Sequence, residues 1–270
     1  MKPVEKIAYI PFKDIKSIEI YINSGKLGLK DIVKETGCDF AITGTFYNNL
    51  WKPVCPLKKD NTVLCSSTDT YRGFKWNNPS DFSTARIPNE TTNYKNHFAC
   101  VALIANGTAY SDDLVQYNAD VGGKRGRTGI GIKGDCLVLY ASKDGTSDAK
   151  TPEKLRDYMF AKGVTNFVMG DGGGKVNYYG DGYLMQGSAK SQNLILVYLN
   201  KETTKPTKPT TTTPDAYPIT QPPIANNSKT ELEIAWDKAC DMGIFDGSNP
   251  TGNVTRRQLA VVLDRLNLLK

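Results

Sequence analysis

The chain has 270 residues, 39% of them hydrophobic and 23% charged, with a formal net charge of +6. This is an ordinary globular composition, with room for one sizeable domain and an appendage. The mild positive charge favours anionic partners, but no basic run or zinc-ligand spacing indicates specific nucleic-acid binding. The longest apolar stretches, such as 98–105, fall far short of the roughly 20 residues of a spanning helix, so no membrane insertion is expected.

The chain up to residue 200 alternates strand-like and helix-like patterns, which predicts an α+β catalytic domain with a mixed sheet. Residues 26–35 form a plausible helix before Gly37, and 151–162 form a stronger one, with Thr151 as its cap and Gly163 after its end. β-branched and aromatic content predicts seven strands, at Ile7–Ile10, Ser17–Tyr21, Phe40–Thr43, Phe98–Ile104, Cys136–Tyr140, Asn166–Met169 and Leu194–Leu199.

The stretch 51–96 is predicted to be rich in loops, and loops of this length are often functional. Its aromatic residues Trp51, Tyr71 and Trp76 are as consistent with loop packing as with a platform for sugar stacking. His97 is the only histidine and is interpreted as a structural residue at the start of a strand. No ligand spacing for a metal is present, and neither a metal nor another cofactor is expected.

Six cysteines occur without a C-x-x-C pair, and reduced, mostly buried thiols are the favoured interpretation. Cys55 and Cys65 are the only pair considered for a disulfide. The segment Met1–Phe12 lacks the apolar core of a secretory signal. Synthesis in the cytoplasm without a signal peptide is therefore expected.

Residues 201–229 are dominated by threonine, proline and lysine, which predicts an extended, flexible linker. Residues 230–270 then predict a small module of two helices, each opened by a capping box, at Thr230 and at Thr255. A unit of about 40 residues rarely folds alone. We therefore expect this module to pack against a partner, with homo-oligomer formation through 230–270 as one possibility.

Three segments of the predicted catalytic domain carry distinctive motifs. The first is Phe40-Ala-Ile-Thr-Gly-Thr-Phe-Tyr-Asn48, a strand that runs into a loop. The second is Gly126-Arg-Thr-Gly-Ile-Gly-Ile132, and the third is Gly170-Asp-Gly-Gly-Gly174, which follows the predicted strand 166–169. Taken in order over about 160 residues, these motifs resemble those of the phosphodiester glycosidase family, of the N-acetylglucosamine-1-phosphodiester α-N-acetylglucosaminidase type.

The resemblance implies a hydrolase that cleaves a sugar-1-phosphodiester bond. It implies that Asp171 is the nucleophile or stabilises the oxocarbenium-like transition state, with Arg127 and Thr128 holding the phosphate. A planar guanidinium suits phosphate oxygens, and glycines let the main chain approach a ligand. The residues expected to bind the substrate are Gly44, Thr45, Asn48, Gly172, Gly173 and Asn193.

The chain departs from the family pattern at the edges of this site. Met169 and Lys175 replace a frequent asparagine and serine, Ala189 replaces a frequent arginine, and Thr43 and Thr45 alter the first motif. These departures leave the sugar open. A non-catalytic wall-binding or adhesion protein that retains the fold stays an alternative, as does a peptidoglycan hydrolase or intracellular glycosidase acting on another glycosyl substrate. Lys175 and Lys190 could contact phosphate, although a solvated role is favoured for each.

Residues 231–270 resemble the S-layer-homology-like helical module that ends many phage and clostridial lysins. The motif stretches Ala235–Ala239, Gly243–Gly247 and Val254–Leu263 carry this resemblance. It implies a cell-wall or surface glycopolymer as partner, and action at the bacterial wall after release in a phage or prophage context.

Overall fold

The structure is a computed structural model that describes residues 4–66, 72–86, 93–109 and 119–200. Contacts divide the chain into two units, Met1–Lys205 and Pro206–Lys270, and the description concerns the first. The predicted linker 201–229 and the predicted helical module 230–270 lie outside the described residues, as do Tyr71 and Cys240. None of the helices in the described part is long and apolar enough to cross a membrane.

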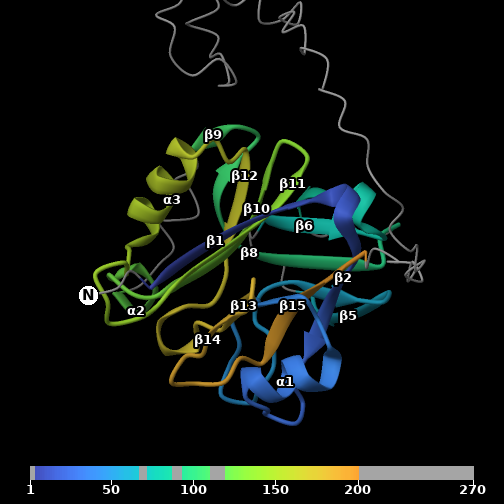
Figure 1. Cartoon of the computed structure of the whole chain (residues 1–270), viewed down its shortest axis with the longest axis horizontal. Helices are drawn as coiled ribbons and strands as arrows, with labels where there is room; N and C mark the ends of the chain where they lie inside the picture. Colours follow the sequence, from blue (N-terminus) through green and yellow to red (C-terminus); the bar gives the residue numbers. More distant parts are fainter. Residues whose placement is uncertain (1–3, 67–71, 87–92, 110–118, 201–270) are drawn as a thin grey trace, which may run out of the picture. The chain divides into compact units, whose positions relative to one another are not determined.

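The described residues form mainly strands, and two helices of eight or more residues accompany them (Figure 1). The helices are α1 (Leu29–Thr36), the short α2 (Ala119–Gly122) and α3 (Pro152–Ala161). The strands are β1 (Glu5–Pro11), β2 (Ile15–Ile22), β3 (Phe40–Thr43), β4 (Leu57–Lys59), β5 (Thr62–Cys65), β6 (Arg72–Trp76), β7 (Ser83–Arg86), β8 (Asn96–Ala105), β9 (Thr108–Ala109), β10 (Arg127–Lys133), β11 (Cys136–Ser142), β12 (Asn166–Met169), β13 (Tyr178–Gly180), β14 (Tyr183–Met185) and β15 (Asn193–Leu199).

The strands assemble into two sheets. The larger follows the order β1-β11-β10-β12-β8-β4-β5, with β6 and β9 also paired to β8 and β7 paired to β6. The smaller has the order β14-β13-β3-β15-β2. Every strand pair found in the described residues is antiparallel. The α+β class agrees with the prediction, but the predicted mixed sheet is wrong, because the described sheets contain no parallel pair.

The smaller sheet is covered on both faces. Along β15, Ile195 and Val197 belong to the main core, which contains side chains from both sheets. Leu194 and Leu196 alternate with them and belong to a second cluster formed with α1. Because successive side chains of a strand point to opposite faces, burial of both faces explains the uninterrupted apolar run of β15. Figure 1 shows α1 beside this sheet and α3 beside the larger one.

All seven predicted strands and both predicted helices are present, with ends that differ by a few residues. Helix α1 begins at Leu29 after Gly28, three residues later than predicted. Helix α3 is capped as predicted, because the Thr151 side chain accepts a hydrogen bond from the N–H of Lys154. Leu155 and Met159 are buried on its inner face.

The glycine-rich second motif is a central strand, which the sequence analysis did not predict. This strand, β10, pairs with β11 on one side and with β12 on the other. A Cβ at Gly129 would lie 2.2 Å from the ring of Phe167, and one at Gly131 would lie 2.5 Å from the Asn166 carbonyl oxygen. These two glycines therefore give space to a neighbouring strand.

The stretch 51–96 also contains more regular structure than predicted, because it holds β4 to β7 around β8. Trp76 is buried, and its indole N–H donates to the Ile18 carbonyl, so it packs the core. Trp51 is partly buried and donates in the same way to the Asn23 carbonyl. Cys55 and Cys65 are not joined to each other in the structure, so the disulfide considered between them is absent.

Candidate active site

The three motif segments meet where β3, β10 and β12 approach one another. The N–H of Asp171 donates to the carbonyl of Gly44 at 2.9 Å, which links the segment after β12 to the segment after β3. The N–H of Gly170 donates to the Thr128 carbonyl at 3.0 Å, and that of Gly173 donates to the Gly126 carbonyl at 2.8 Å. Residues far apart in sequence are thus held together by main-chain hydrogen bonds at the junction of the two sheets.

Close main-chain packing explains why several of these positions are glycine. A Cβ at Gly170 would lie 2.6 Å from the Gly44 carbonyl oxygen, and one at Gly172 would lie 2.5 Å from the Gly126 carbonyl oxygen. At Gly44 itself, a Cβ would lie 2.0 Å from Oδ1 of Asn193. Any side chain at these positions would therefore push the motif segments apart.

Asp171 is the central acidic residue of this junction, and it is only 7% exposed. Its Oδ1 accepts a hydrogen bond from the N–H of Gly172 at 2.8 Å. Its Oδ2 is buried and accepts no hydrogen bond, although the ammonium of Lys175 lies 3.4 Å away. Burial raises the pKa of Asp171, and the charge of Lys175 partly opposes this rise. A buried carboxylate oxygen that accepts no hydrogen bond is uncommon and marks a place where a ligand or reacting atom could bind.

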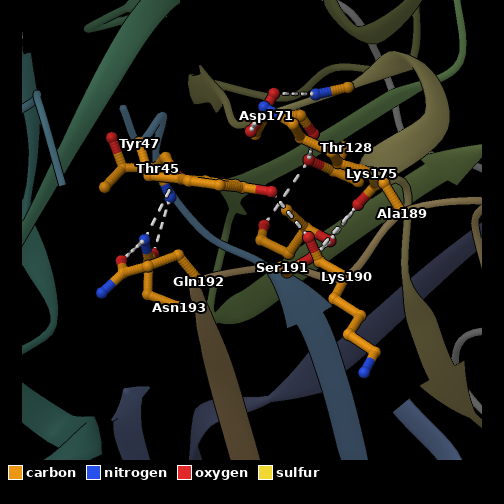
Figure 2. A network of polar contacts seen from close by, with 12 residues as sticks. Thr45, Tyr47, Thr128, Asp171, Lys175, Ala189, Lys190, Ser191, Gln192 and Asn193 are labelled. Carbon is orange, nitrogen blue, oxygen red and sulfur yellow. Dashed lines mark hydrogen bonds and ion pairs between the residues drawn. The ribbon is translucent and has the colours of Figure 1, made fainter. Parts of the chain in front are cut away.

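The ammonium of Lys175 lies close both to this carboxylate and to an aromatic ring. Its Nζ is 4.1 Å from the ring centroid of Tyr47. The hydroxyl of Tyr47 donates to the carbonyl of Lys190 at 2.8 Å, which fixes the ring. Figure 2 shows that the side chain of Lys190 itself points away from Asp171.

A cavity of about 400 Å³ opens beside these residues. Among the described residues that line it, Asp171 is the one carboxylic acid, whereas three side chains are cationic. The lining consists of Phe46, Tyr47, Val121, Arg125, Arg127, Asp171, Gly172, Gly173, Gly174, Lys175 and Ala189. An acid surrounded by cations suits a substrate that carries both a reacting centre and a negative charge.

Arg127 lines the cavity but uses much of its guanidinium on the protein. Its Nε donates to the Lys150 carbonyl, and its Nη2 donates to the carbonyls of Val121 and Gly123. Burial and, to a smaller extent, the charge of Arg125 lower the pKa of Arg127 to about 10. Its Nη1 donates to the sulfur of Met169 at 3.6 Å. Arg127 therefore fixes the segment around α2, and any contact with phosphate is left to what remains of Nη1.

Thr128 is fully buried, and its hydroxyl donates to the carbonyl of Asp171 at 2.6 Å. It thus positions Asp171 and lies outside the cavity lining.

Of the six residues predicted to bind substrate, Gly172 and Gly173 line the cavity, whereas the other four lie outside its lining. Asn193 is buried and pairs with Thr45, since its Oδ1 accepts from the Thr45 N–H and its Nδ2 donates to the Thr45 carbonyl. The Asn48 side chain accepts from the N–H groups of two residues of its own turn, Leu50 and Lys52.

Tyr47 and Arg125 were not predicted to belong to the site, and a solvated role was favoured for Lys175. Two sequence signals point to these residues. Arg125 lies two positions before Arg127, and Lys175 follows Asp171 by four positions. Tyr47 lies within the first motif, but nothing in the sequence shows that its ring meets Lys175.

His97 is remote from this cavity, which its side chain does not line. It is buried in β8, and its Nε2 has no hydrogen-bond partner. Burial, together with the charges of Lys58 and Lys75, lowers the pKa of His97 to about 4. The part of the chain that the structure describes holds no group of three or more potential metal ligands.

Comparisons with known proteins relate the fold to solved structures. No protein-family model and no curated protein sequence matches the chain. The catalytic domain of zebrafish N-acetylglucosamine-1-phosphodiester α-N-acetylglucosaminidase, auto-inhibited by its pro-peptide, is similar in structure, with a TM-score of 0.57 and 13% identity over 73% of this chain and 84% of that one. A hypothetical protein from Synechocystis is similar with a TM-score of 0.55 and 11% identity, over 73% of this chain and 59% of that one. A third similar structure, from Burkholderia pseudomallei, has a TM-score of 0.52 and 8% identity, over 72% of this chain and 73% of that one. The chain therefore shares its fold with a phosphodiester glycosidase, at low sequence identity.

Proposed function

We propose that the chain is a hydrolase that cleaves the bond between the anomeric carbon of a sugar and the oxygen of a phosphodiester. The observation that carries this proposal is Oδ2 of Asp171, a buried carboxylate oxygen that accepts no hydrogen bond beside a cavity with three cationic side chains. The fold shared with a phosphodiester glycosidase supports the same reaction class.

In this reaction the bond from C1 to the bridging oxygen breaks, and the phosphate leaves with that oxygen and the bonding electron pair. Asp171 either attacks C1 or stabilises the positive charge that develops there. A water molecule then adds its hydroxyl group to C1 and releases its other proton to the phosphate product or to solvent. If Asp171 has bonded to C1, that bond breaks in this step and its electron pair returns to the carboxylate. Because a phosphate group leaves more readily than an alkoxide, the reaction needs no strong general acid, which agrees with a single carboxylic acid in the described cavity lining.

Arg125 is exposed at the rim of the cavity, and we propose that it contacts the phosphate together with the remaining N–H groups of Arg127. Guanidinium groups are well suited to phosphate oxygens. This assignment extends the phosphate-holding role predicted for Arg127 to a neighbour whose side chain is more accessible.

For the whole chain we propose a substrate in a bacterial wall or surface glycopolymer, with residues 230–270 as a wall anchor and 201–229 as a tether. The resemblance of 231–270 to lysin modules supports this context, as does the net charge of +6, which favours an anionic polymer. Comparing sedimentation with purified walls for the full chain and for a chain lacking 201–270 tests the anchor. Equal binding of the two would contradict it.

The catalytic proposal is tested by incubating the protein with glycosyl-1-phosphodiesters, among them UDP-N-acetylglucosamine and teichoic acid, and measuring the released sugar. Wild type is expected to release sugar, Asp171→Asn to lose at least about a hundredfold in rate, and the exposed Lys190→Met to keep its rate. Binding of wall polymer without release of sugar would instead support the non-catalytic alternative.

A further inference from the structure

Lys175 is anchored through its main chain while its ammonium has donors to spare. Its carbonyl accepts hydrogen bonds from the hydroxyls of Thr43 and Ser191, at 2.7 and 3.1 Å, and from Nδ2 of Asn177 at 3.1 Å. These three side chains hold the turn that follows the Asp-Gly-Gly-Gly motif. The position of the lysine main chain is therefore fixed, whereas its side chain is 34% exposed at the cavity.

The ammonium of Lys175 is poorly satisfied where it lies. It is 3.4 Å from Oδ2 of Asp171, but this oxygen accepts no hydrogen bond from it. Its other described contact is the face of the Tyr47 ring, at 4.1 Å from the centroid. An ammonium group has three N–H donors and forms its strongest contacts with charged oxygens.

The charges around the cavity are unbalanced. Arg125, Arg127 and Lys175 face one carboxylic acid, Asp171, among the described lining residues. Asp171 and Lys175 are an ion pair in which each group would gain from a better partner, namely a phosphate for the ammonium and a sugar carbon for the carboxylate.

We infer that Lys175 binds the phosphate group of the substrate and, in doing so, leaves Oδ2 of Asp171 free to face the anomeric carbon. This inference rests on the proposed function, since it assigns the phosphate contact of that site. The ammonium of Lys175 thus exchanges one anionic partner for another. In the free protein it neutralises the carboxylate of Asp171, and in the complex it neutralises the phosphate of the ligand. Tyr47 keeps the ammonium between the two positions.

This exchange selects the substrate. A neutral glycoside offers Lys175 no anion, so the ammonium stays with Asp171 and the carboxylate is not released. The site therefore favours glycosyl phosphates over neutral glycosides of the same sugar. Free phosphate is expected to compete with the substrate for the ammonium of Lys175. In the absence of substrate, the carboxylate of Asp171 is expected to compete with free phosphate for the same ammonium.

The competition gives a test that needs no turnover, namely calorimetric titration of the full chain with inorganic phosphate. Lys175→Met is expected to weaken binding at least about tenfold, as removal of a charge-assisted hydrogen bond should, and Lys175→Arg to restore most of it. Asp171→Asn is expected to bind phosphate more tightly than wild type, because the competing carboxylate charge is gone. Lys190→Met, which removes an equal charge from an exposed side chain nearby, is expected to bind as wild type does.

Equal phosphate affinity of Lys175→Met and Lys190→Met would overturn the inference, and so would unchanged or weaker binding by Asp171→Asn. If no glycosyl phosphodiester is hydrolysed but these affinities follow the expected order, the result contradicts the proposed reaction and still supports phosphate binding by Lys175. Where turnover is found, the acidic limb of the kcat/KM profile should move to higher pH in Lys175→Met. Loss of the lysine charge removes the interaction that keeps the pKa of Asp171 down, whereas a purely structural role for Lys175 would not shift this limb.

Discussion

The main-chain N–H of Asp171 donates a hydrogen bond to the carbonyl of Gly44 across 2.9 Å, and this bond joins segments that follow strands of different sheets. The approach is possible because Gly170 has no side chain, since a Cβ there would lie 2.6 Å from the Gly44 carbonyl oxygen. Gly44 itself packs against Asn193, whose Oδ1 would lie 2.0 Å from a Cβ at Gly44. The candidate catalytic acid is therefore placed by main-chain packing between the sheets.

Gly44→Ala is expected to lower the free energy of unfolding by about 1–3 kcal/mol, the usual cost of overpacking a tight interior. It should also lower kcat/KM, because the buried amide of Asn193 does not yield without moving the segment that holds Asp171. Chemical denaturation and steady-state kinetics measure the two effects. Gly25→Ala is the control, since its Cβ would meet Leu27 at an ordinary 3.5 Å. Equal stability of the two variants would contradict this role of Gly44.

Thr128→Val is expected to lower both stability and activity. It keeps the shape of the side chain but leaves the carbonyl of Asp171 without its 2.6 Å hydrogen bond, at a cost of about 1–3 kcal/mol. Thr128→Ser keeps the hydroxyl and should retain most of both properties. Denaturation midpoints of the two variants check this prediction, which fails if valine and serine behave alike.

The two arginines of the cavity should differ in what they contribute. Arg127→Met should destabilise the protein by several kcal/mol, because three main-chain carbonyls lose a buried donor. Arg125→Met should leave the melting temperature nearly unchanged and raise KM, because the Arg125 side chain is exposed at the cavity. Thermal melts and kinetics of both variants test this division of roles. A stable Arg127→Met variant that shows only a raised KM would instead restore the role first predicted for that residue.

His97 should make the stability of the protein depend on pH. Its pKa is about 4 in the folded protein, against 6.5 for an unperturbed histidine, so the unfolded state binds more protons between these values. Stability is then complete above pH 6.5 and is lost as the pH falls towards 4. From about pH 7 to about pH 5 this amounts to about 2 kcal/mol.

Urea denaturation of wild type and of His97→Gln at these two pH values measures the effect. The glutamine variant has a side chain that does not titrate, and since His97 is the only histidine, the difference between the two pH values should shrink by about that amount. An unchanged difference would show that the His97 pKa is not depressed in the folded protein.

The positions of seven strands were readable from the sequence because β-branched and aromatic residues are concentrated in them, and some are buried along most of their length, as in Phe40–Thr43 and Asn166–Met169. Strand β10 was not, because its glycines carry no side chains for a periodic pattern and are required by the ring of Phe167, a partner distant in sequence. Strand β5 was missed for a different reason. Three of its four residues are exposed, so it has no buried face to detect.

The same limit applies to the site. Motif order brought out Asp171, Arg127 and Thr128, and all three meet at the junction of the sheets. The sequence does not show which donors of the site remain available to a ligand. Contacts with distant residues decide this, such as the contact of Arg127 with Val121 and that of Lys175 with Tyr47, and no local pattern encodes them. Arg127 was predicted to hold the phosphate with its whole guanidinium group, and this interpretation changes because most of that group binds the protein. Lys175, for which a solvated role was favoured, is now inferred to bind the phosphate.

The central claim is that the bond from the sugar carbon to oxygen breaks, and hydrolysis in water enriched in oxygen-18 tests it most directly. If Asp171 acts at C1, mass spectrometry will find the label in the anomeric hydroxyl of the released sugar and none in the phosphate product. Label in the phosphate would show attack at phosphorus, and would contradict a glycosidase at this site.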